Sequence, residues 1–111
     1  MKERIIVLNG TVILQFEQDY EWKNKKVFKA GNIKPGLYDL YLAKEPNKNS
    51  ILKGKILFRD KEFTYQTTDL GLIKYKNSSL TFKVELYVTY SLQYTTGKVS
   101  IADSKSLMPI I

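Results

Sequence analysis

Residues 80–94 alternate between apolar and polar side chains almost without interruption. The even positions are apolar or aromatic: Leu80, Phe82, Val84, Leu86, Val88, Tyr90, Leu92 and Tyr94. Every odd position except Tyr87 is polar. A period of two places successive side chains on opposite faces of a β-strand, one face buried and the other in water. The pattern predicts a mostly β chain, and a run of this length predicts a bend or bulge near Glu85.

Turn signals divide the rest of the chain into short segments. Asn9-Gly10, Asp60-Lys61 and Thr95-Thr96-Gly97 each separate runs rich in apolar or β-branched residues. Such segments are typical of a mostly β fold, here a small twisted antiparallel barrel or sandwich. We expect six to eight strands and at most one short helix, and the class includes SH3-like barrels. The 111 residues predict a single domain, 1–111, that ends in a loose tail over residues 103–111.

The clearest hairpin signal is Asn9-Gly10, which lies between two apolar runs. Asn-Gly favours a type I′ turn, in which both central residues adopt a positive φ. A two-residue loop here pairs Val7 with Val12 and Ile5 with Leu14. These four side chains are therefore expected on one face of the hairpin.

A three-stranded meander is expected between residues 51 and 76. A two-residue turn at Asp60-Lys61 pairs Phe58 with Phe63, and a three-residue loop at 69–71 pairs Gln66 with Lys74. In this register one face is apolar, and the other carries Lys53, Lys55, Arg59, Gln66, Lys74 and Lys76. We predict that this polar face binds a partner, with its cations on phosphates and Gln66 forming hydrogen bonds. The alternative is an ordinary solvated face, because antiparallel sheets often have one wet side.

The polar segment 17–26 contains Trp22 and is expected to form a short helix or an excursion between strands. Lysines recur from residue 23 to residue 34 without an intervening carboxylate. Together with Tyr87, the aromatic residue on the polar side of the alternating run, this segment is a second candidate interface. Its members are Trp22, Lys23, Lys25, Lys26, Lys29 and Tyr87. The alternative is a charged surface that is simply solvated.

Ten residues on the apolar faces of these strands are predicted to form the core. They are Ile5, Val7, Leu14, Ile56, Phe58, Phe63, Ile73, Val84, Leu86 and Val88. A shift of one residue in the pairing of a strand moves its whole apolar set to the other face. Burial of these side chains therefore tests the predicted registers.

The composition disfavours catalysis. The sequence has no histidine and no cysteine, which removes the commonest general base, the commonest metal ligand and any thiolate site. Its 11 carboxylates are scattered, without the clustered pairs that acid–base chemistry uses. We therefore predict a protein that is not an enzyme and that uses neither a cofactor nor a metal.

The charge favours a polyanionic partner. Eighteen basic residues against 11 acidic ones give a formal net charge of +7. A lysine-rich surface that only keeps the chain soluble explains the charge equally well. No secretory signal is visible, and no apolar run approaches the ~18 residues of a membrane span. We expect a cytoplasmic location without membrane contact.

Five short segments follow one another in the order and spacing of a known family. They are Pro35-Gly36-Leu37-Tyr38 with Leu40 and Ala43, residues 53–57, Tyr65-Gln66, residues 72–75 with Ser79-Leu80, and Val88 and Tyr90 with residues 97–99. Together they resemble the KfrB-like domain of plasmid proteins, over about residues 35–100. That domain occurs alone or joined to conjugative relaxases. The family usually has histidine where this chain has Tyr75. The resemblance implies mobile DNA in bacteria as the context and implies no particular reaction.

Two functions of different class remain. The first is a non-catalytic binding module encoded by a plasmid or phage, whose partner is a nucleic acid or a nucleic-acid-handling protein. The second is a small protein inhibitor of a host defence system, similar to an anti-CRISPR, that acts by protein–protein contact. Nuclease-sensitive recovery of a partner favours the first, and one stoichiometric protein partner favours the second.

Overall fold

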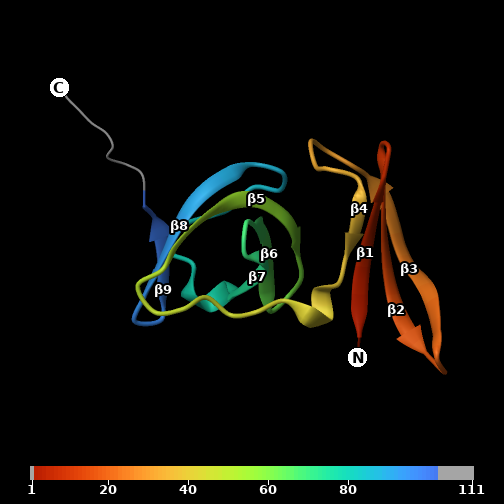
Figure 1. Cartoon of the computed structure of the whole chain (residues 1–111), viewed down its shortest axis with the longest axis horizontal. Coiled ribbons are helices and arrows are strands. Elements are labelled where there is room, and N and C mark those ends of the chain that lie inside the picture. Colours follow the sequence, from red (N-terminus) through yellow and green to blue (C-terminus); the bar gives the residue numbers. More distant parts are fainter. Residues whose placement is uncertain (1, 103–111) are drawn as a thin grey trace. The chain divides into compact units, whose positions relative to one another are not determined.

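The computed structural model describes residues 2–102 and is mostly β, as the sequence predicts (Figure 1). The strands are β1 (Glu3–Leu8), β2 (Thr11–Gln18), β3 (Glu21–Lys29), β4 (Gly36–Tyr38), β5 (Ile51–Arg59), β6 (Phe63–Thr68), β7 (Gly71–Lys76), β8 (Thr89–Thr95) and β9 (Lys98–Ile101). Over this range the helical elements are two 3₁₀ turns, η1 (Leu40–Leu42) and η2 (Asn77–Ser79). The tail expected at 103–111 lies outside the described residues.

Residue contacts divide the chain into two compact units, Met1–Ala43 and Lys44–Ile111. The first unit holds a four-stranded antiparallel sheet in the order β3-β2-β1-β4, called sheet A here. The second holds a five-stranded antiparallel sheet in the order β7-β6-β5-β8-β9, called sheet B. The boundary at Ala43 lies inside the region of family resemblance, and the single domain stays a prediction.

The register expected for the first hairpin of sheet A is confirmed. Val7 pairs with Val12 and Ile5 with Leu14, and all four side chains are buried. The turn type is different from the prediction. Gly10 has a φ of 89°, but Asn9 is not among the residues with positive φ, so the turn is not type I′.

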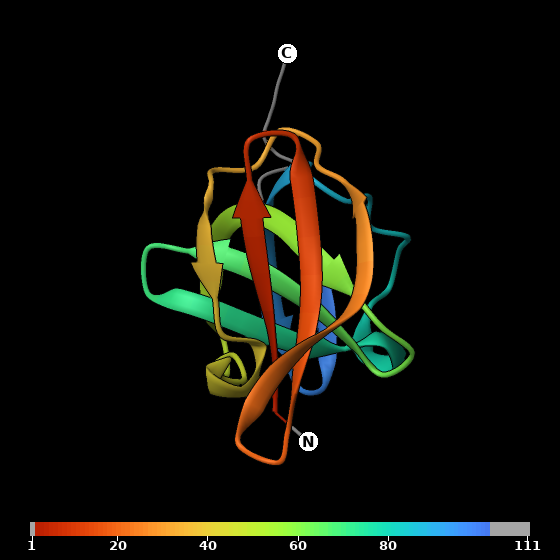
Figure 2. The same ribbon diagram turned by 90° about the vertical axis from the view of Figure 1, so that its right-hand side faces the viewer.

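The segment 17–26 is neither a helix nor an excursion. It is the end of β2 and the start of β3, which form a second hairpin around Asp19-Tyr20. Both turn residues have a positive φ, 53° and 65°, as a type I′ turn requires. The residue types at this turn did not predict it, since tyrosine rarely adopts this conformation. Figure 2 shows the resulting sheet, with β3 and β4 at its two edges.

Sheet B curves strongly, and β5 forms an arc in Figure 1. Along residues 51–55 β5 pairs with β8, and along residues 54–59 it pairs with β6. Gly54 lies where the two pairings overlap. A Cβ at this position would lie 1.5 Å from the carbonyl oxygen of Thr67, so only glycine fits. A β-bulge between Ile56 and Phe58 bends the strand further.

The register predicted for the meander is wrong, by two residues between β5 and β6 after the bulge and by one residue between β6 and β7. Phe58 pairs with Tyr65 instead of Phe63, and Gln66 pairs with Ile73 instead of Lys74. The loop between β6 and β7 has two residues, since Thr68 pairs with Gly71. The bulge also inverts the alternation of β5: side chains after Leu57 lie on the face opposite to the one that a regular strand would give them.

The alternating run 80–94 is not one strand. Only Thr89–Thr95 forms β8, and residues 81–88 are irregular. Leu80 makes a parallel bridge to Val99, and Tyr87 donates its amide to the carbonyl of Ile56 at 2.8 Å. Val84 belongs to the core cluster of this unit, and Leu80 and Phe82 pack against it, although residues 81–88 form no strand.

Six of the ten predicted core residues are buried: Ile5, Val7, Leu14, Ile56, Ile73 and Val84. Phe58 and Phe63 are half-buried, and Leu86 and Val88 are exposed by 43% and 39%. The buried cluster of sheet B consists of Ile56, Ile73, Tyr75, Val84, Leu92 and Val99. Phe58 lies at the bulge, and Leu86 and Val88 lie in the irregular segment, while Phe63 pairs with Lys76 on the face away from the core cluster.

Candidate functional site

Four of the six residues predicted for the binding surface share one face of sheet B. Lys53 and Lys55 on β5 point away from the core cluster, on the same side as Lys74 and Lys76 on β7. Arg59 does not belong to this group. The bulge pairs it with Thr64, whose side chain is on the opposite side of the sheet.

Gln66 does not belong to the surface either, because it is fully buried. Its Oε1 accepts a hydrogen bond of 2.7 Å from Tyr75 Oη. Its Nε2 donates to carbonyl oxygens of Leu52, Gly54 and Tyr90, at 3.3, 3.2 and 3.1 Å. The side chain predicted to bind a partner instead ties four strands of sheet B together.

The register reveals a fifth lysine that the sequence analysis missed. Lys98 on β9 pairs with Thr95, on the same face as Lys53. The lysine face is defined here as Lys53, Lys55, Lys74, Lys76 and Lys98. Lys53, Lys76 and Lys98 are exposed, and the other two are half-buried. The pairing of β8 with β9 was the missing signal, since Lys98 alone resembles any turn-flanking lysine.

None of the residues in the five strands of sheet B is aspartate or glutamate. By contrast, the strands of the first unit contain carboxylates that form ion pairs: Lys25 with Glu3 at 2.9 Å, and Lys2 with Glu17 at 3.9 Å. The strands of sheet B therefore contribute basic side chains to the lysine face and no acidic ones.

Aromatic side chains lie among these lysines. Phe58 and Phe63 flank Tyr65, with ring centroids 6.2 and 6.3 Å from it. Lys74 Nζ lies 4.7 Å from the Phe63 centroid, which is a cation–π contact. Tyr65 is only 7% exposed, so it is not available to stack on a base. Phe58 and Phe63 were predicted to face the core, but the observed register places all three rings on the same side of the sheet as the lysines.

The second candidate interface is divided between the two units. Trp22, Lys23, Lys25, Lys26 and Lys29 lie on β3, while Tyr87 belongs to the second unit. Tyr87 was predicted to be an exposed aromatic anchor but is half-buried, with a φ of 66°. On β3, Lys26 pairs with Leu14, on the buried face, and Lys29 is on the other side. These lysines line an edge strand, where lysine also prevents pairing with another chain.

Trp22 is half-buried and engaged within its own unit. The Arg4 guanidinium carbon lies 4.1 Å from the Trp22 ring centroid, and the Tyr41 ring is 6.1 Å away. Arg4 also donates to Gln15, which in turn donates to Asn24. The predicted anchor is therefore part of a surface network across sheet A.

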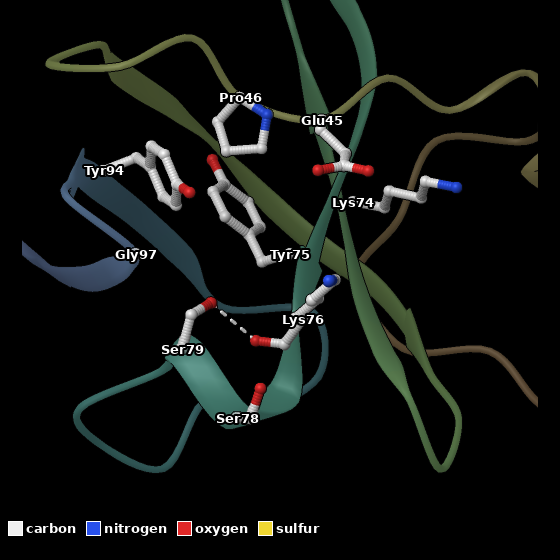
Figure 3. Close-up of a pocket in the computed structure, with 9 residues that line it drawn as sticks. All are labelled: Glu45, Pro46, Lys74, Tyr75, Lys76, Ser78, Ser79, Tyr94 and Gly97. Carbon is white, nitrogen blue, oxygen red and sulfur yellow. Dashed lines mark hydrogen bonds between the residues drawn. The ribbon is translucent and has the colours of Figure 1, made fainter.

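A pocket of about 200 Å³ opens beside β7 (Figure 3). It is lined by Glu45, Pro46, Lys74, Tyr75, Lys76, Ser78, Ser79, Tyr94 and Gly97. Figure 3 shows the Lys74 side chain extending away from Tyr75, and Lys74 Nζ is held over Phe63. The pocket thus shares Lys74 and Lys76 with the lysine face, and the Lys74 ammonium points away from Tyr75.

Tyr75 is at the base of this pocket and is 2% exposed. Burial raises the pKa of the Tyr75 phenol well above its usual range, so the group stays protonated and donates to Gln66. The residue at this position therefore carries no charge near neutral pH, where a histidine would titrate.

Residues 2–102 contain no group of three or more acidic, histidine or cysteine side chains that could hold a metal ion. Over the same range, no helix has the length and apolar character needed to cross a bilayer.

No protein-family model and no curated protein matches this sequence, so the likeness to the KfrB-like domain rests on the quoted motifs alone.

Proposed function

We propose that this chain is a non-catalytic binding module of a bacterial mobile element, and that its lysine face contacts the phosphates of a nucleic acid. The observation that carries the proposal is the absence of any carboxylate from the strands of sheet B, which contain Lys53, Lys55, Arg59, Lys74, Lys76 and Lys98. Lysines dominate non-specific binding to nucleic acids because they displace counterions from phosphates. The family resemblance supplies the mobile-DNA context.

The same geometry argues against base reading. Gln66, which was expected to hydrogen-bond to the partner, is buried and uses its amide on Tyr75 and strand carbonyls. Tyr65 is too buried to stack on a base. Lysine is a point charge without the planar fork that reads guanine. Binding should therefore depend on phosphate number and hardly on sequence.

The test compares two triple charge reversals. Lys53→Glu/Lys76→Glu/Lys98→Glu changes the three exposed members of the lysine face, and Lys23→Glu/Lys26→Glu/Lys29→Glu changes three exposed lysines of β3. Each triple variant lowers the formal net charge from +7 to +1. Only the position of the charge differs between them. Fluorescence anisotropy with labelled duplex DNA of two unrelated sequences, at several salt concentrations, measures the affinities.

We expect the unmodified protein to bind both duplexes equally, with a log–log salt slope of about −0.9 per phosphate and three to five phosphates engaged. The sheet B variant should lose binding, while the β3 variant keeps most of it. Equal loss in both variants would mean that net charge alone acts. The absence of binding to DNA and RNA at low salt would refute the nucleic-acid site.

A second candidate function is the protein inhibitor of host defence. It is favoured by one observation, a set of exposed aliphatic side chains on sheet A that includes Val27 and Leu37, exposed by 61% and 53%. Apolar surface of this kind suits a protein partner and contributes nothing to phosphate binding. Salt-insensitive binding to a single protein, unaffected by the sheet B reversals, would support this function over the first.

A further inference from the structure

A row of aliphatic side chains crosses one face of sheet A from edge to edge. Ile6 on β1 pairs with Ile13 on β2 and, on its other side, with Leu37 on β4. Ile13 pairs in turn with Val27 on β3. These four residues, called the aliphatic row, span roughly 14 Å at the ~4.8 Å spacing of neighbouring strands. Val27 and Leu37 are exposed, and Ile6 and Ile13 are half-buried.

The aliphatic row is not part of the core of this unit. The buried side chains Ile5, Val7, Val12 and Leu14 come from the opposite face of the same strands. An antiparallel sheet with one buried face normally carries polar residues on the other. Contiguous apolar side chains on an exposed face are typical of surfaces that contact another molecule.

The charges around the row are positive. Arg4 precedes Ile6 by two residues and Lys29 follows Val27 by two, so both lie on the face of the row. Among the residues of the four strands, Glu17 is the one carboxylate on this face, and its Oε1 lies 3.9 Å from Lys2 Nζ. The other two strand carboxylates, Glu3 and Glu21, are on the opposite face by register.

We propose that the aliphatic row docks a protein segment whose apolar stripe is flanked by carboxylates. The stripe would cover the row, and the carboxylates would lie near Arg4 and Lys29. A second copy of this chain fits poorly, because each copy carries +7 and docking would bring the same cations together. A nucleic acid fits poorly because aliphatic side chains offer no donors to phosphates or base edges.

The chain carries its own reporter for this surface. Trp22 is the single tryptophan, and it pairs with Glu17 on the face of the row. The probe is a designed helical peptide with a leucine stripe between two lines of glutamate. A matched peptide has lysine in place of every glutamate. Titration of the full chain with each peptide, followed by Trp22 emission, should give a saturable change with the acidic peptide alone.

The variant that tests the row is Val27→Thr/Leu37→Thr, which removes apolar surface at two exposed positions and keeps strand-compatible backbones. The control is Leu70→Thr, since Leu70 is 72% exposed but lies in the turn between β6 and β7. The double variant should bind the acidic peptide about tenfold more weakly or worse, and the control should match the unmodified chain. Circular dichroism verifies that both remain folded.

Four outcomes would overturn the proposal. Equal binding of the lysine peptide would remove the charge argument, and undiminished binding by the double variant would remove the row. A dimer in sedimentation that Val27→Thr/Leu37→Thr abolishes would show that a second copy is the occupant. A titration without any saturable emission change would show that an acid-flanked apolar segment does not dock here.

Discussion

Sheets A and B use their two faces in opposite ways. Sheet A buries one aliphatic face and exposes a second one, and its polar contacts are on the surface, as in the chain from Arg4 through Gln15 to Asn24. Sheet B contributes Ile56, Ile73, Leu92 and Val99 to one buried cluster, places a buried glutamine among them and presents lysines on the other side. The first sheet is thus suited to apolar contacts and the second to anions.

The comparison also separates two sources of structural specificity. Sheet A is built mainly from local hairpins, whose pairing follows from residues close in sequence. In sheet B the central strand β5 changes partner at Gly54 and bulges at Leu57. Its register therefore depends on contacts between distant segments. Three matched pairs of substitutions, with one member of each pair in each sheet, test how far this difference extends.

The largest effect is expected at the glycines. Gly54→Ala places a Cβ against the Thr67 carbonyl, where the space is 1.5 Å, and should lower the free energy of unfolding by about 3 kcal/mol or more. The control is Gly36→Ala in sheet A, where the nearest atom is 3.8 Å away, and it should change stability by less than about 0.5 kcal/mol. Urea unfolding followed by circular dichroism measures both. Similar losses would show that Gly54 has room that the structure does not provide.

The next effect concerns the two glutamines. Gln66→Ala removes a buried amide that accepts from Tyr75 and donates to three carbonyls, and should cost about 2–4 kcal/mol. Gln15→Ala breaks the partly exposed bridge between Arg4 and Asn24 and should cost less than about 1 kcal/mol. Chemical denaturation gives both values. If Gln15→Ala were the more damaging change, the buried network would not be what holds sheet B.

The smallest effect is a difference in pH dependence. Burial raises the pKa of Tyr75 above that of an unfolded tyrosine, near 10, so the folded state keeps a proton that the unfolded state releases. This contribution to stability is fully present below pH 10 and falls as the pH rises further, by at most about 1.4 kcal/mol per pH unit.

Tyr75→Phe should remove this contribution. The free energy of unfolding of the variant would then fall less steeply above pH 10 than that of the unmodified chain. Tyr38→Phe is the control in sheet A, because Tyr38 is more exposed and burial also raises its pKa. Its substitution should alter the alkaline slope less. Parallel curves for Tyr75→Phe and the unmodified chain would contradict the assigned role of Tyr75.

The sequence predicted several local features correctly. Asn9-Gly10 between two aliphatic runs was enough to pair Ile5 with Leu14, because a two-residue loop leaves one register that buries both. The sequence did not predict the turn at Asp19-Tyr20, since tyrosine rarely adopts a positive φ. For the candidate site, the alternation of side chains along the strands correctly placed Lys53, Lys55, Lys74 and Lys76 on one face.

The same alternation predicted the wrong face for Gln66 and Arg59, and it did not identify Lys98 as a member of the lysine face. The bulge at Leu57 changes the alternation of β5, so Arg59 lies on the face opposite to Lys55. The two-residue loop at Asp69-Leu70 shifts β7 by one position, and Gln66 then faces the core opposite Ile73. A bulge needs no particular residue, so the side-chain pattern before and after it looks the same as in a regular strand.

The mostly β class and the first hairpin follow from the sequence alone, since alternation and turn chemistry are local and each leaves few structural solutions. Only the tertiary structure decides that residues 80–88 leave the sheet while 89–95 stay in it, and that a glutamine is buried where a lysine face was expected to continue. Both outcomes depend on how β5 meets β6 and β8. Gly54 leaves room for the Thr67 carbonyl, and the bulge inverts the alternation of side chains along β5. Both features depend on contacts between segments distant in sequence, which the residue pattern of one segment does not contain.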